Sequence, residues 1–238
     1  MRNWVTYADS KFSSDSKYSA PFHSRSSNPN AVNIAKYLYN KSINLIKQYK
    51  NGKTKSLTFE YCKHAKIKND TNSKIYLDDY YLGFIAKSGS NKGKKVTTNE
   101  KAKNLLYELN KLSNRGLQSY ALLGLALHVV QDYFAHLTKI DVYKSNKKYF
   151  SGTTTSFSNN ILKNTKKFED NTSVIPWRYN NSKRVTYVIY DLYQKQKTIK
   201  RIDVKYSNNK NDSYLYFAGG RSNFYTVKSK EYYLTITY

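Results

Sequence analysis

Residues 122–136 read LLGLALHVVQDYFAH, the most apolar stretch of the chain, and they include three potential metal ligands four residues apart. On a helix, with about 100° per residue, His128, Asp132 and His136 form one row on one face. Because burial of an isolated carboxylate is costly, Asp132 needs a partner. Neutral imidazoles and a carboxylate are zinc ligands, so the row predicts a metal site. A hydrogen-bonded His–Asp–His network without an ion, or a helix face open to solvent, is the alternative.

Residues 123–137, LGLALHVVQDYFAHL, resemble the LGxALHxxQDxxAH signature of bacterial proteins related to zinc-dependent phospholipase C. That motif is shared with fungal heterokaryon-incompatibility proteins, and the wider superfamily includes the single-strand-specific zinc nucleases. The resemblance implies that His128 and Asp132 bind zinc on a core helix. His136 departs from the pattern, because the three residues between it and Asp132 are fewer than in the classical phospholipase C.

The same resemblance points to a downstream acidic turn, here Phe168-Glu169-Asp170-Asn171, so that Glu169 or Asp170 completes the site. Related proteins often have a His just before this turn, whereas residues 165–167 of this chain are Thr, Lys and Lys. The second zinc site of the family would therefore lack a ligand here, or draw it from elsewhere in the chain.

Two further histidines are candidate metal ligands. His23 precedes a run of capping residues that opens a helix, which suits an early His of the family, but a solvated loop His fits as well. His64 has i,i+4 spacing to Glu60, although its Lys-rich surroundings also fit an exposed segment. Trp4 resembles the N-terminal Trp whose amine binds zinc in the family, yet three residues precede it, and ordinary packing is the alternative.

The chain of 238 residues has 41 Lys and Arg against 16 Asp and Glu, a net charge of +25. This excess predicts polyanionic partners, either an anionic phospholipid membrane surface or nucleic acid. Part of it reflects a composition rich in Lys, Asn, Tyr and Ile. Residues 117–143 lack this basic excess, since Lys139 is their only Lys or Arg and Asp132 and Asp141 are their only acidic residues. We expect a basic coat around this region to attract an anionic substrate.

Apolar periodicity predicts a helix over residues 31–50 that stops at Asn51-Gly52. A second helix is predicted over about residues 180–196, and its inward face is Val185, Ile189 and Leu192. Between Tyr143 and about residue 157 we expect an irregular connection. From residue 198 the apolar residues alternate, which predicts a small antiparallel sheet. The four predicted strands are Ile199–Tyr206, Ser213–Ala218, Phe224–Lys228 and Tyr232–Tyr238.

Together with the resemblance, these patterns predict a fold that is mainly α, a phospholipase C-like helical core with a small C-terminal antiparallel β segment. We expect residues 1–197 to form a helical metal-binding domain and residues 198–238 a β appendage. The single cysteine, Cys62, excludes an intrachain disulfide. The longest apolar run, residues 121–127, is too short to span a bilayer. The resemblance favours a secreted protein whose leader has been removed, with a cytoplasmic protein as the alternative.

The functional hypothesis is a zinc-dependent phosphodiester hydrolase, phospholipase C-like, that acts on phospholipid head groups. Zn²⁺ would lower the pKa of a bound water towards about 7, and the resulting hydroxide would attack phosphorus. Asp132 and Asp170 would be the catalytic carboxylates of this hydrolase. One alternative is a zinc nuclease acting on single-stranded nucleic acid. The other is a non-enzymatic basic protein that binds polyanions or membranes and has a structural metal site.

Overall fold

The structure is a computed structural model that describes residues 31–57, 84–85, 95–96, 108–162, 168, 171–208, 212–217 and 224–238. Its helices are α2 (Ala31–Lys50), α4 (Arg115–His136), α5 (Thr154–Asn160) and α6 (Pro176–Gln194). Its strands are β1 (Phe84–Ile85), β2 (Lys95–Val96), β3 (Lys139–Lys144), β4 (Lys147–Thr153), β5 (Arg201–Tyr206), β6 (Asp212–Phe217), β7 (Phe224–Ser229) and β8 (Tyr232–Thr237).

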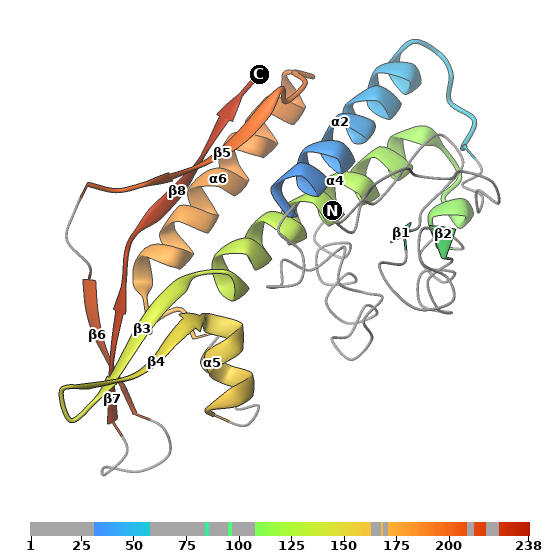
Figure 1. The fold of residues 1–238 in the computed structure, drawn as a ribbon. Coiled ribbons are helices and arrows are strands. Elements are labelled where there is room, and N and C mark those ends of the chain that lie inside the picture. The colour runs from blue at the N-terminus through green and yellow to red at the C-terminus, as the bar shows by residue number, and fades with distance from the viewer. Residues whose placement is uncertain are drawn as a thin grey trace.

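Helix α4 lies at the centre of the helical layer, with α2 along one side of it and α6 on another (Figure 1). It begins where the Asn114 side chain caps it, since Oδ1 accepts a hydrogen bond from the Leu117 N–H at 2.9 Å. Its apolar residues are buried on nearly all sides, which is the pattern of a core helix. The buried Gln118 amide is fully used, because it donates to the carbonyls of Leu57 and Leu109 and accepts from the Leu57 N–H.

Helix α2 confirms the prediction for residues 31–50. It ends at Asn51-Gly52, where Gly52 adopts a φ of 83° that glycine accommodates without strain. Asn40 on this helix joins it to the distant chain before β5: Nδ2 donates to the Ile199 carbonyl and Oδ1 accepts from the Ile199 N–H, both at 2.8 Å. Nearby, the Tyr39 hydroxyl donates to the Lys197 carbonyl at 2.7 Å.

The strands form a four-stranded antiparallel sheet in the order β4-β3-β7-β6, a separate β5-β8 pair, and the short β1-β2 pair. The prediction of a mainly α fold with a small C-terminal β segment is therefore wrong. β3 and β4 follow α4 directly, and β3 pairs with β7. The expected irregular connection after Tyr143 is a hairpin, because Ile140 and Val142 face the core and Ser145 and Asn146 both have positive φ, as tight hairpin turns require.

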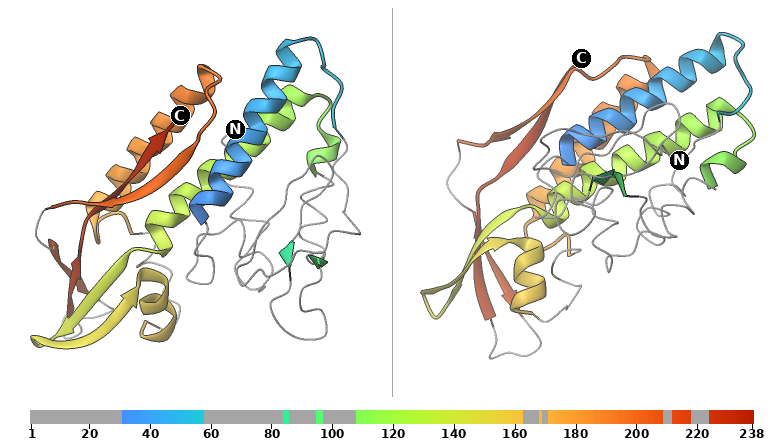
Figure 2. Two further views of the ribbon diagram at one scale, coloured as in Figure 1. Left: turned by 45° about the horizontal axis from the view of Figure 1, so that its top comes forward. Right: turned by 45° about the vertical axis from the view of Figure 1, so that its right-hand side comes forward.

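The C-terminal strands match their predicted positions, but they belong to two sheets. β7 lies in the four-stranded sheet, and the chain continues through Lys230 and Glu231 into β8, which pairs with β5 beside α6 (Figure 2). An aromatic cluster holds these layers together. The Tyr232 ring of β8 stacks on Phe134 of α4 at 5.2 Å and meets Trp177 of α6 edge-on at 5.0 Å. Such ring pairs add stability beyond the burial of their area.

Candidate metal centre

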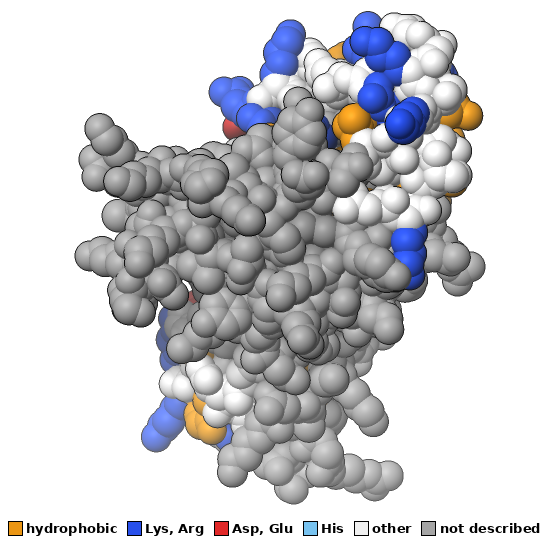
Figure 3. Space-filling view, turned by 90° about the vertical axis from the view of Figure 1, so that its right-hand side faces the viewer, with side chains coloured by type: hydrophobic (Ala, Val, Ile, Leu, Met, Phe, Trp, Pro, Cys, Tyr) orange, Lys and Arg blue, Asp and Glu red, His pale blue; other side chains and the backbone are white. Residues whose placement is uncertain are grey.

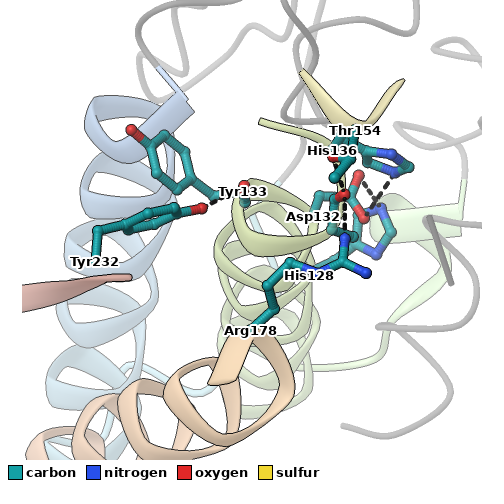
Figure 4. Close-up of polar contacts among 8 residues, drawn as sticks. His128, Asp132, Tyr133, His136, Thr154, Arg178 and Tyr232 are labelled. Atoms are coloured by element: carbon teal, nitrogen blue, oxygen red, sulfur yellow. Dashed lines mark hydrogen bonds and ion pairs between the residues drawn. The ribbon is translucent and has the colours of Figure 1, made fainter. Parts of the chain in front are cut away.

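His128, Asp132 and His136 lie in a row along the last turns of α4 (Figure 4). His128 Nε2 is 3.3 Å from Asp132 Oδ2, and His136 Nε2 is 3.6 Å from Asp132 Oδ1. Each imidazole therefore faces a different oxygen of the same carboxylate. This arrangement follows from the i,i+4 spacing, which stacks the side chains of neighbouring turns on one face.

Burial decreases along the row towards the end of the helix. The side chains of His128, Asp132 and His136 are 5%, 11% and 17% exposed, respectively. Asp132 is thus a nearly buried carboxylate, which in protein interiors needs a cation or hydrogen-bond donors to offset lost hydration. The row is closed at His128 and most accessible at His136.

Arg178 of α6 is bound to the last turn of α4 beside this row. Its guanidinium is buried, and Nη1 donates to the carbonyl of Ala135 at 2.9 Å, a group that also accepts from the Thr154 hydroxyl (Figure 4). Carbonyls in the last turn of a helix lack intrahelical donors, and a cation there also interacts favourably with the helix dipole. Arg178 Nη2 lies 3.3 Å from the carbonyl of Asn171 and 3.5 Å from that of Phe168.

Neither Arg178 nor Thr154 was among the predicted site residues. A signal for Arg178 was present, because it lies seven residues before Val185 and so shares the face predicted to point inward. An arginine on an inward face needs acceptors, which here are backbone carbonyls. Thr154 gave no such signal, since it falls in the stretch expected to be irregular.

On the other side of the last turn, Tyr232 binds the backbone of α4. Its hydroxyl donates to the Tyr133 carbonyl at 3.1 Å (Figure 4). The same hydroxyl lies within hydrogen-bond distance of Thr138 Oγ1, also at 3.1 Å. Complete burial raises the pKa of Tyr232 above its ordinary value of 10.0, so the group is neutral at physiological pH. The end of α4 is therefore fixed by α6 on one side and β8 on the other.

The other predicted ligands, His23, His64 and Asp170, lie outside the described residues, as do Trp4 and Glu169. Within the described part of the chain, no group of three or more His, Cys, Asp or Glu side chains surrounds a single ion position. Phe168 and Asn171, which flank Glu169 and Asp170 in the sequence, are described, and both contribute carbonyls to Arg178.

Basic side chains gather on the surface at the end of α2, where Lys47 and Lys50 occupy the last turn and Lys53 and Lys55 follow. Figure 3 shows Lys and Arg at this end of the molecule, at the top of the view. None of the helices in the described part of the chain is both long and apolar enough to cross a bilayer.

No protein-family model, curated protein or solved structure matches this chain. The chemistry of the row is therefore inferred from its own residues.

Proposed function

We propose that His128, Asp132 and His136 bind Zn²⁺ and that the protein is a metal-dependent phosphodiester hydrolase. The spacing of the donor atoms is the observation that carries the proposal. In a tetrahedral zinc site with bonds of about 2.0–2.2 Å, neighbouring ligand atoms lie about 3.3–3.6 Å apart. The two nitrogen–oxygen distances in the row are 3.3 and 3.6 Å. A charge-assisted hydrogen bond would draw the same atoms to about 2.7–2.9 Å.

The row supplies two pairs of metal-ligating atoms and not a single cluster of three ligands. His128 with Oδ2, and His136 with Oδ1, each provide two ligands, so these three residues would hold one or two Zn²⁺ ions. Two-metal sites are common in phosphoesterases. The remaining ligands would come from other segments, for which His23, His64 and Asp170 are the candidates from the sequence.

When bound, Zn²⁺ would polarise a phosphoryl oxygen and make a hydroxide nucleophile available at neutral pH. The chain's own residues would position the ligands and attract the substrate. Asp132 holds the two imidazoles at a fixed separation, and its burial strengthens its attraction for a cation. Arg178 fixes the last turn of α4, so His136 stays in register with Asp132. The net charge of +25 would concentrate an anionic substrate, for which we propose phospholipid head groups, at the surface.

A second candidate is a basic polyanion-binding protein without hydrolytic activity. Each imidazole already faces a carboxylate oxygen, which supports a buried network that needs no ion. The two candidates differ in metal content and in turnover.

Zinc per chain and hydrolysis of p-nitrophenyl phosphorylcholine and single-stranded DNA test both candidates. We expect at least one zinc per chain and choline-phosphoester turnover in the wild type, and loss of both in Asp132→Asn. Asp141→Asn is the matched control, because Asp141 lies on the sheet in an ion pair with Lys148. Turnover of DNA alone would indicate a nuclease, and zinc without turnover would favour the binding protein. A wild type that takes up no zinc would refute the metal site.

A further inference from the structure

A trough of about 200 Å³ runs between α6 and β8, away from the candidate metal centre. Its α6 wall is Asn181, Arg184, Val185 and Val188, and its β8 wall is residues 233–236. The helix and the strand run side by side, as Figures 1 and 2 show. The eight residues from Asn181 to Val188 on the helix and the four from Tyr233 to Ile236 on the strand both span about 10 Å from end to end, so the two walls have the same length.

The backbone of β8 presents one hydrogen-bonding edge to this trough. The Ser207 N–H donates to the Glu231 carbonyl at 2.9 Å across the β5–β8 ladder. Hydrogen-bonded pairs alternate along an antiparallel ladder, so Tyr233 and Thr235 also bond to β5. Tyr232, Leu234 and Ile236 therefore direct their N–H and C=O groups the other way.

A hydrogen bond from Asn181 on α6 supports this direction. Asn181 Nδ2 donates to the carbonyl of Tyr232, which points away from β5, at 2.8 Å. Further along, the described residues make no hydrogen bond to the outward backbone groups of Leu234 and Ile236. The strand reads YYLTIT and has no charged side chain. Natural sheet edges are usually protected from further pairing by charges, prolines or bulges, and β8 contains no Lys and no Pro.

The opposite wall combines apolar surface with one positive charge. Val185 is buried, whereas Val188 is 40% exposed and leaves a hydrophobic strip facing the strand. The Arg184 guanidinium is exposed and makes no hydrogen bond or ion pair within the part of the chain that the structure describes. An arginine beside an open strand edge suits a carboxylate carried by an extended chain.

We propose that this trough binds an extended acidic peptide segment, which adds to β5 and β8 as a third strand. The backbone of the peptide bonds to Leu234 and Ile236, its alternate side chains lie on Val188, and an acidic side chain meets Arg184. Strand addition of this kind draws affinity from backbone bonds and selectivity from side-chain pockets. A second copy of this chain fits less well, because each copy carries a charge of +25 and would bring another arginine to the trough.

The test is a titration of ¹⁵N-labelled protein with the peptide acetyl-Val-Thr-Glu-Thr-Val-amide, in which the Glu and both Val side chains share one face of a strand, followed by NMR. We expect saturable shifts at Leu234 and Ile236 and slower hydrogen exchange of their amides in the complex. Arg184→Glu should weaken binding about tenfold, the loss expected for one charge-assisted hydrogen bond replaced by a repulsion. Lys183→Glu is the matched control, since it changes the net charge equally from the neighbouring position, where Lys183 lies near the Tyr187 ring. We expect its affinity to stay within about twofold of the wild type.

Three results would overturn the proposal. The first is equal weakening by both substitutions, which would indicate attraction to the overall charge. The second is the absence of saturable shifts at Leu234 and Ile236. The third is slow exchange of these two amides without peptide, which would show that the edge is already paired. If that protection rises with protein concentration, the edge binds a second copy of the chain and not an acidic peptide.

Discussion

Replacing Tyr232 by Phe should lower stability at neutral pH and raise it relative to the wild type at high pH. The substitution removes one buried hydroxyl that contacts Tyr133 and Thr138. Neither former partner is left without a bond, because the Tyr133 carbonyl still accepts from the Leu137 N–H and Thr138 still donates to Phe134. The cost at pH 7 is therefore that of one net hydrogen bond, about 1.4 kcal/mol, and not that of an orphaned buried group.

The pH dependence of this difference follows from the raised pKa of Tyr232. Above the unfolded pKa of about 10, the unfolded chain loses the phenolic proton while the folded chain keeps it, so the wild type loses stability as pH rises. At pH 11 the loss is about 1.4 kcal/mol, since one pKa unit corresponds to about that free energy. The Tyr232→Phe protein has no such proton, and all other tyrosines are common to both proteins. The two stability curves should therefore cross near pH 11.

Urea unfolding followed by circular dichroism, at intervals from pH 7 to 11.5, measures this crossing. Equal m-values in the two proteins would establish that the unfolded states are comparable. A difference in unfolding free energy that stays constant from pH 8 to 11 would refute the reasoning, because it would mean that the Tyr232 hydroxyl ionises as readily in the folded protein as in the unfolded chain.

Two further predictions concern buried polar groups on α4. Gln118→Leu should lower the unfolding free energy by about 2–4 kcal/mol, since it leaves the Leu57 and Leu109 carbonyls without their donor and the Leu57 N–H without its acceptor. Urea unfolding measures this, and a loss below about 1 kcal/mol would contradict it. Burial raises the pKa of Tyr193 to about 12, and the hydrogen bond with Ser119 moderates that rise. Ser119→Ala should therefore shift the ionisation of Tyr193 to higher pH in an ultraviolet titration, with a shift to lower pH as the opposing result.

The C-terminal strands and α2 could be predicted closely because their signals are local. Alternation in residues 224–228 and 232–238 marks two strands, and Asn51-Gly52 marks the end of a helix. The partners of those strands could not be predicted in the same way. Pairing of β7 with β3 depends on a sheet begun more than 80 residues earlier, and no local pattern records it.

The hairpin of β3 and β4 was missed because its composition resembles that of a loop. The strand β4 reads KKYFSGT, in which Phe150 is the one clearly apolar residue that packs against the core. At the candidate metal centre, the row on α4 followed from helical spacing alone. Arg178 did not, because its partners are backbone carbonyls, which every residue possesses and no sequence distinguishes.

The link between Asn40 and Ile199 has a consequence for the order of folding. The two residues are 159 positions apart, so closing that loop costs about 4–5 kcal/mol of chain entropy. Two hydrogen bonds contribute about 2 kcal/mol, which is too little to form the link first. α2 must already be docked on α4, and α4 on α6, before Asn40 can meet its partner. Protection of the Ile199 amide in a pulse-labelling experiment would thus report completion of the native state and no earlier event.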